Sequence, residues 1–267
     1  CRYSTTGSST WVNAQPTLRP TKYGTLALAH NGNLTNTGDL AELVQKLEAT
    51  YTRGATTDTE IMTALIALQD SKNVEASALA VLPQLEGAFS LIFMDERTLY
   101  AARDRHGVRP LVLGKLETGW VVASESAGLD IVGAAFVREI EPGELISVDA
   151  QGVRSQRWAD AQPKGCLFEY VYLARPDTTI AGSGIHKTRV AIGAQLAKEQ
   201  PAEADLVIPV PESGTPAAIG YAKESGIPFG MGLVKNSYVG RTFIQPSQTI
   251  RQLGIRLKLN PLREIIE

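Results

Sequence analysis

The hydrophobic pattern of the chain changes character near residue 160, and this change restricts the fold more than any other feature. Between Gly87 and Trp158, short apolar runs alternate with turn residues, which is typical of antiparallel strands. Beyond residue 160, the purely apolar run Asp205–Pro211 is typical of a strand in a parallel sheet, and it follows an expected helix at about His186–Glu199. We therefore expect an α+β domain followed by an α/β domain, with residues 1–160 in the first and 161–267 in the second.

Helical periodicity before the strand-rich region predicts three helices. Leu40 and Val44 belong to the first apolar stripe, the second helix follows Asp58, and the third lies around residues 74–85. An apolar strand at residues 24–29 is expected to run into a turn at His30–Asn33, and the Ser- and Thr-rich start is expected to be a loop as far as about Pro20. Antiparallel sheet flanked by helices is the economical interpretation.

Composition excludes several classes of protein. The 267 residues carry a formal net charge of −2, so we expect no nucleic-acid partner and no membrane partner. No apolar run approaches the ~20 residues of a membrane span, and no signal peptide opens the chain. Two cysteines indicate no disulfide framework and favour the cytoplasm. The chain does not begin with methionine, which we interpret as processing or a partial sequence.

The first residue is a cysteine, and a free N-terminal cysteine can be a nucleophile that uses its own α-amino group as the base. Four other residues of the first half carry groups that suit an amino-acid substrate. The Arg2 guanidinium suits an α-carboxylate, the Asp58 carboxylate suits an α-ammonium, and Asn31 beside Gly32 suits an oxyanion hole. Each signal is weak alone, because Asn-Gly is often a turn and Asp58 can simply cap the following helix.

The second half contains a candidate anion site. The expected strand at 205–211 ends in Glu212, Ser213, Gly214 and Thr215 and opens into a helix, so loop N–H groups and a helix N-terminus converge. An ordinary strand-to-helix turn is the alternative.

A basic segment, Lys235–Lys258, includes Lys235, Tyr238 and Arg241 and suggests a lid over a phosphorylated substrate. A solvated basic surface is the alternative for this segment. Cys166, without neighbouring thiols, is typical of a small buried residue.

Seven motifs occur in one order along the chain, and together they are far more specific than each alone. They are RYSTTGSSTW, LAHNGNLTN, RDRHGVRPLVLG, ASESAGLD, FEYVYLARPDTTI, VIPVPESGTPAAIGYA and NSYVGRTFIQPSQTIRQLGIRLKLNP. In these motifs the whole chain resembles the amidophosphoribosyltransferase family, whose members open purine synthesis.

The resemblance implies a truncated N-terminal-nucleophile glutaminase domain, an αββα sandwich, followed by a truncated type I phosphoribosyltransferase domain. Glutamine would be hydrolysed in the first, and ammonia would displace diphosphate from phosphoribosyl diphosphate (PRPP) in the second. Arg2 and Asp58 would bind glutamine, and Asn31 with Gly32 would form the oxyanion hole. Residues 212–215 would bind the diphosphate, and the segment with Lys235, Tyr238 and Arg241 would close over it.

The resemblance also implies cofactors and partners. Ser213 matches a ligand of Mg2+, and Cys166 matches one ligand of the [4Fe-4S] iron–sulfur cluster that one branch of the family contains, whereas other branches have this cysteine without a cluster. Purine nucleotide inhibitors and a homotetramer are expected for the full-length parent.

The departures from the family pattern concern both ends. Family members begin with Cys-Gly several dozen residues before the RYSTTG-type motif, whereas Cys1 directly precedes it here. Consecutive side chains in extended structure diverge, so Cys1 and Arg2 are poorly arranged to hold one glutamine. The PRPP signature, Asp-Asp-Ser followed by Gly-Thr-Thr, does not occur. We therefore expect a fragment that lacks both ends, is inactive in both half-reactions and is aggregation-prone.

Two other hypotheses remain open. A non-catalytic ligand-binding module derived from the enzyme is the first. A different glutaminase-coupled enzyme, such as a sugar amidotransferase, is the second, but it would share only the first half of the motifs.

Overall fold

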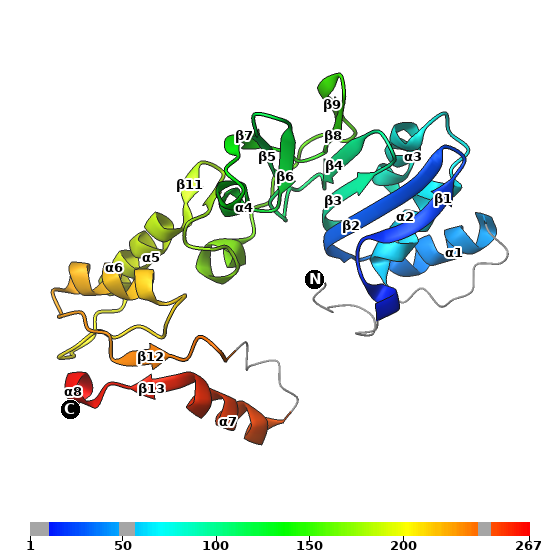
Figure 1. The fold of residues 1–267 in the computed structure, drawn as a ribbon. Coiled ribbons are helices and arrows are strands. Elements are labelled where there is room, and N and C mark those ends of the chain that lie inside the picture. The colour runs from blue at the N-terminus through cyan, green and yellow to red at the C-terminus, as the bar shows by residue number, and fades with distance from the viewer. Residues whose placement is uncertain (1–10, 48–56, 240–246) are drawn as a thin grey trace. The chain divides into compact units, whose positions relative to one another are not determined.

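The computed structural model describes residues 11–47, 57–239 and 247–267, and the chain divides into two compact units, residues 1–166 and 167–267 (Figure 1). The first unit extends past the expected boundary at residue 160. Its last segment is held by two backbone hydrogen bonds, because Gln162 N–H donates to the Arg105 carbonyl at 2.8 Å and Lys164 N–H donates to the His106 carbonyl at 2.9 Å. Each unit is described by itself.

A six-stranded antiparallel sheet, here sheet A, organises the first unit. The strands in spatial order are β1 (Thr17–Thr21), β2 (Gly24–Leu34), β3 (Gly87–Met94), β4 (Leu99–Arg103), β8 (Glu144–Asp149) and β9 (Gly152–Arg157). The expected strands over residues 87–103 and 144–157 are therefore confirmed. Residues 17–20, expected in a loop, instead form most of β1.

The expected turn at His30–Asn33 is wrong, because these residues continue strand β2. They pair with β3 in unbroken antiparallel register, with His30 opposite Leu91, Asn31 opposite Ser90 and Gly32 opposite Phe89. Asn-Gly favours a turn only where no neighbouring strand satisfies its backbone groups, and β3 does so here.

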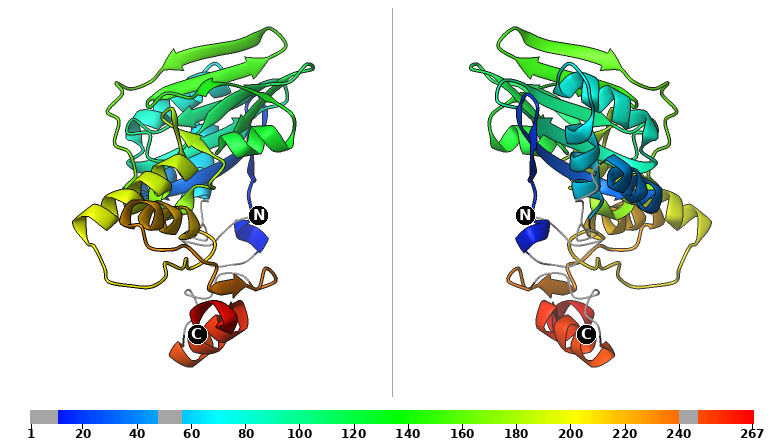
Figure 2. Two further views of the ribbon diagram at one scale, coloured as in Figure 1. Left: turned by 90° about the vertical axis from the view of Figure 1, so that its left-hand side faces the viewer. Right: turned by 90° about the vertical axis from the view of Figure 1, so that its right-hand side faces the viewer.

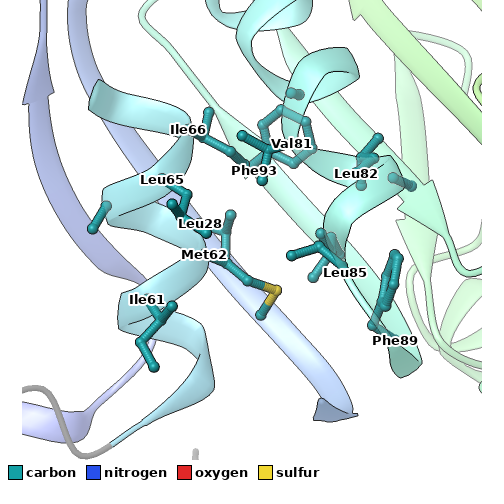
Figure 3. Close-up of a cluster of buried hydrophobic side chains, with 14 of the residues drawn as sticks. Leu28, Ile61, Met62, Leu65, Ile66, Val81, Leu82, Leu85, Phe89 and Phe93 are labelled. Carbon is teal, nitrogen blue, oxygen red and sulfur yellow. The ribbon is translucent and has the colours of Figure 1, made fainter. Parts of the chain in front are cut away.

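Three helices cover one face of sheet A. They are α1 (Thr37–Leu47), α2 (Asp58–Leu68) and α3 (Val74–Val81). A short 3-10 turn at Leu82–Gln84 follows α3 and brings it close to the end expected for the third helix. The right-hand view of Figure 2 shows these helices in front of the strands. Met62 and Leu65 of α2 pack with Leu28 and Phe93 of the sheet in the main apolar core (Figure 3).

The other face of sheet A packs against a second sheet, sheet B, in the order β6 (Trp120–Ala123), β5 (Val112–Lys115) and β7 (Ala135–Glu139). Leu113 of β5 lies in one buried cluster with Ala101 and Ile146 of sheet A. Val112, which points the other way, packs against Leu129 of helix α4 (Ser126–Ile131). The layers are therefore helix, sheet, sheet, helix, and the expected αββα sandwich is confirmed.

The second unit is built around a helix pair. Its first half holds a π-helical turn at Glu169–Leu173 and the hairpin β10 (Thr179–Ile180) and β11 (Ser183–Gly184), followed by α5 (Ile185–Glu199) and α6 (Thr215–Ser225). The helix expected at 186–199 is thus confirmed. Two glycines bring α5 and α6 close: a Cβ on Gly193 would lie 1.9 Å from the Ala217 carbonyl oxygen, and one on Gly220 would lie 1.9 Å from that of Val190.

The strand expected at 205–211 is wrong in extent, because within the described residues it is reduced to one parallel bridge between Val207 and Phe229. Pro209 and Pro211 donate no backbone hydrogen bond, and Val210 keeps 62% of its surface exposed. The unit continues with β12 (Leu233–Lys235), α7 (Gln248–Lys258), β13 (Leu259–Pro261) and α8 (Arg263–Ile266). No helix among the described residues is long and apolar enough to cross a membrane.

Candidate active site

The end of strand β2 carries the predicted oxyanion-hole residues, Asn31 and Gly32. Gly32 has φ of +144°, and a Cβ at this position would lie 2.0 Å from the Ala88 carbonyl oxygen. Both observations require glycine, because an L side chain rarely adopts this φ and has no room here. The sequence Asn-Gly at this point therefore meets a backbone requirement of the strand.

Consecutive side chains of β2 point to opposite faces of sheet A. The side chains of Leu26, Leu28 and His30, every second residue of the strand, all point to the face covered by α2, where the two leucines are fully buried in the main core. Asn31 points toward sheet B, and its Nδ2 donates to Ser124 Oγ, just after β6, at 3.4 Å. The inner face between the two sheets therefore holds the Asn31 amide.

Asp58 lies on the helix side of sheet A, at the first residue of α2. Its side chain does not cap that helix, because the N-cap is Thr57, whose Oγ1 accepts from Glu60 N–H at 3.3 Å. The Asp58 carboxylate instead accepts from Leu34 N–H at 3.3 Å and from Thr59 N–H at 2.9 Å. His30 Nδ1 lies 3.5 Å from Asp58 Oδ1. The predicted glutamine-binding carboxylate thus contacts His30, on the face of β2 opposite the Asn31 side chain.

The electrostatic environment favours the charged form of Asp58. Burial raises the pKa of this carboxyl group, since only 7% of the residue is exposed, but the hydrogen bond and the charge of His30 act against burial. Together with the N–H groups of Leu34 and Thr59 they bring the pKa below the ordinary 3.8. The carboxylate is therefore anionic at neutral pH, as binding of an ammonium group requires.

Sequence reasoning missed the side chains that connect these residues. Gln15 Oε1 accepts from His30 N–H at 2.8 Å, and Gln15 Nε2 donates to Thr59 Oγ1 at 3.0 Å, so Gln15 ties β2 to α2. His30, Ser124 and Gln15 were not identified as site residues. The alternation of side chains along a strand would have placed His30 opposite Asn31, had residues 30–33 been recognised as strand.

The remaining predicted residues of the glutaminase half, Cys1 and Arg2, lie outside the described residues, as does Arg241 of the expected lid. Their placement stays a prediction.

In the second unit the structure brings together two predicted residues of the anion site. Lys235 Nζ, at the end of β12, lies 3.2 Å from Glu212 Oε2. Gly214 is the N-cap residue of α6, which has no side-chain cap, and Thr215 is the first residue of the helix, so Ser213 directly precedes the helix start. Tyr238 is fully exposed. The loop 212–215, a helix N-terminus and one lysine are therefore neighbours.

Metal-binding potential differs between the two predicted metal residues. Glu212 and Ser213 offer a carboxylate and a hydroxyl, which are the hard oxygen donors that Mg2+ takes alongside substrate phosphates. A [4Fe-4S] cluster needs four thiolates, whereas the chain contains two cysteines, so its residues do not complete such a cluster. Cys166 is partly buried and free, and no group of three metal-ligating side chains occurs in the part of the chain that the structure describes.

Comparison with known proteins gives consistent results. A family model described as a glutamine amidotransferase domain matches residues 4–130. A relative in Mycobacterium tuberculosis, named amidophosphoribosyltransferase, is 65% identical over 272 residues, which cover 100% of this chain and 51% of the relative. A protein of the same name in Synechococcus elongatus is 48% identical. That match covers 99% of this chain and 55% of the relative.

Solved structures agree in fold. The glutamine PRPP amidotransferase from B. subtilis, complexed with ADP and GMP, matches with a TM-score of 0.87 and 40% identity, covering 97% of this chain and 57% of that chain. The chain spans about half the length of the curated relatives it matches. Along essentially its whole length, the chain is therefore similar to proteins named amidophosphoribosyltransferase, over about half of their own length.

Proposed function

We propose that the protein carrying this chain is a glutamine-dependent amidophosphoribosyltransferase of the first step of purine biosynthesis. It would convert PRPP, glutamine and water to 5-phosphoribosylamine, glutamate and diphosphate. The observation that carries the glutaminase half is the end of β2, where a backbone that requires glycine follows an asparagine whose amide faces the space between two sheets.

In the glutaminase half-reaction a thiolate attacks the side-chain amide of glutamine, and negative charge develops on the amide oxygen. The Asn31 amide and the Gly32 N–H would stabilise that oxyanion, which is usually the largest electrostatic contribution to such a reaction. Arg2 would bind the α-carboxylate of glutamine as a bidentate partner, and Asp58 would bind its α-ammonium group. Whether Cys1 contributes the thiolate is decided by the Cys1→Ala variant.

In the second half-reaction ammonia attacks C1 of PRPP and diphosphate leaves. Residues 212–215 and the N-terminus of α6 would bind the diphosphate, since N–H groups at a helix start favour anions. Lys235, Tyr238 and Arg241 would close over it. Mg2+, held by Ser213 with Glu212 nearby, would neutralise charge on the leaving diphosphate.

Regulation, assembly and location follow the family in this proposal. The B. subtilis neighbour was crystallised with ADP and GMP, which supports purine nucleotides as inhibitors here. We further propose a homotetramer in the cytoplasm. An iron–sulfur cluster with Cys166 as one ligand stays a prediction for the full-length protein.

The test separates the two half-reactions in the protein expressed from its complete reading frame. Asn31→Ala should lower glutamine-dependent synthesis of phosphoribosylamine by about 10²–10³-fold, the usual loss for one oxyanion-hole donor, and leave synthesis from free ammonia unchanged. A matched control is Asn36→Ala, because Asn36 lies beyond the end of β2 and bonds the backbone of residues 84 and 86. Absence of both activities from the unmodified protein would favour a non-catalytic module.

A further inference from the structure

His30 carries a buried ionisable side chain next to the predicted site. Only 1% of its side chain is exposed. Nδ1 faces Asp58 Oδ1 at 3.5 Å, whereas Nε2 is buried and has no hydrogen-bond partner among the described residues. A buried ring nitrogen without a partner is unfavourable, so its retention calls for an explanation.

The imidazole lies between the two predicted functional elements of the first unit. On its Nδ1 side is Asp58, predicted to bind the substrate ammonium. On its Nε2 side is Gly32, where a Cβ would lie 3.0 Å from Nε2. The ring thus packs directly against the strand segment that carries the oxyanion-hole N–H, and any larger residue at position 32 would displace it.

The partners of Asp58 fix its orientation. Oδ2 accepts from Leu34 N–H, and Oδ1 accepts from Thr59 N–H and from Thr59 Oγ1 at 3.5 Å, with His30 Nδ1 nearby. Since Leu34 is in β2 and Thr59 in α2, the carboxylate also bridges the strand to the helix.

We propose that His30 is a positioning residue of the glutamine site, holding the Asp58 carboxylate through Nδ1–H while its ring packs against the backbone of Gly32. The proposal rests on the proposed glutaminase function. His30 touches neither substrate nor nucleophile in this role; it acts through Asp58 and Gly32.

Two substitutions separate the hydrogen bond from mere packing. In His30→Asn, the side-chain amide N–H occupies roughly the position of Nδ1–H, whereas in His30→Gln it reaches toward the position of Nε2. We expect the KM for glutamine to rise about tenfold or more in His30→Gln, the loss typical of one hydrogen bond to a charged group, and to stay within about threefold in His30→Asn. Ammonia-dependent synthesis should be unchanged in both, which reports that the second half-reaction is intact. His106→Asn, at a partly exposed histidine of the same unit, is the matched control.

A second measurement does not depend on glutamine chemistry. The carboxyl carbon of Asp58 is titrated by NMR in the protein expressed from its complete reading frame, and its midpoint should rise in His30→Gln but not in His30→Asn. Equal KM values in all variants, or equal loss of both half-reactions in His30→Asn and His30→Gln, would overturn the positioning role. If the unmodified protein shows no glutamine-dependent activity, the proposed function fails, and an unchanged Asp58 midpoint would then refute the His30 contact separately.

Discussion

Gly220→Ala tests whether the close approach of helices α5 and α6 holds the second unit together. In an open helical position this change stabilises a protein, because alanine is favoured over glycine by up to about 1 kcal/mol. Here the new Cβ would lie 1.9 Å from the Val190 carbonyl oxygen and 2.8 Å from its carbon. Both are backbone atoms, so no side chain can rotate away.

The cost follows from the separation needed. To restore ordinary contact the helices must move apart by roughly 1.5 Å, and a gap of even 0.5–1 Å forfeits a quarter to a half of each dispersion contact. Overpacking typically costs about 1–3 kcal/mol. After the gain in helix propensity we expect a net loss of about 1–2 kcal/mol, which would lower the melting temperature of a unit of this size by about 4–15 °C.

The assay uses the distribution of tryptophan in the chain. Trp11, Trp120 and Trp158 all belong to the first unit, so fluorescence reports its unfolding, whereas far-UV circular dichroism reports both units. Gly220→Ala should lower a dichroism transition that fluorescence does not follow. Gly38→Ala is the matched control, because Gly38 in α1 has no atom within 4 Å of its Cβ position, and this variant should be as stable as the unmodified chain or more so.

A double variant sharpens the test. Gly193 meets the Ala217 carbonyl oxygen as Gly220 meets that of Val190, so once one substitution has separated the helices the second costs less. The loss in Gly193→Ala with Gly220→Ala should therefore be smaller than the sum of the single losses. A Gly220→Ala chain that melts at or above the unmodified temperature would refute the steric reasoning.

Three further predictions concern charged groups. Glu144 is 5% exposed and accepts two hydrogen bonds from Arg138 at 2.6 and 2.8 Å. Glu144→Gln should therefore destabilise the first unit by about 1–3 kcal/mol, measured by urea unfolding followed by fluorescence. Glu117→Gln, at an exposed glutamate, should leave the free energy of unfolding unchanged. Burial raises the pKa of Glu144, but hydrogen bonds from Arg138, Ser155 and the Glu141 N–H outweigh burial and hold the pKa below 4.5. The ionised carboxylate therefore stabilises the fold above pH 4.5, and this stabilisation is lost as the pH falls through the folded-state pKa. Below about pH 4.5, the free energy of unfolding should consequently depend less steeply on pH in Glu144→Gln than in the unmodified chain. Lys235→Gln should weaken PRPP binding to the complete protein by about tenfold, measured by calorimetry, because it removes one charge-assisted contact. Glutaminase activity should not change. Equal weakening in the control variant Lys198→Gln would count against a specific site.

The sequence predicted the helices of the first unit well, because their apolar stripes are long and regular. Local preference failed at residues 30–33, where pairing with β3 overrides the turn tendency of Asn-Gly. The division of the expected meander into two sheets also escaped prediction. Leu113 and Val112 of β5 are both buried, on opposite faces, and an apolar run of this kind carries no information about which strands lie beside it.

The candidate site was predictable in residue type but not in arrangement. Asn31, Gly32 and Asp58 were identified, yet their separation across β2 depends on strand parity and on the position of α2, which only the three-dimensional structure supplies. Gln15, His30 and Ser124 act through contacts with residues 15 to 93 positions away along the chain, which no local motif reports.

The alternation along β2 also limits how this part of the molecule can change. His30 serves the helix layer and Asn31 serves the space between the sheets, so inserting or deleting a single residue between Gly24 and Ala29 would exchange their faces unless the strand slipped against both neighbours. Point substitutions on β2 therefore affect one face at a time, whereas we expect a change in its length to disturb both faces. Libraries aimed at β2 should accordingly vary its residues in place and confine insertions to the loops.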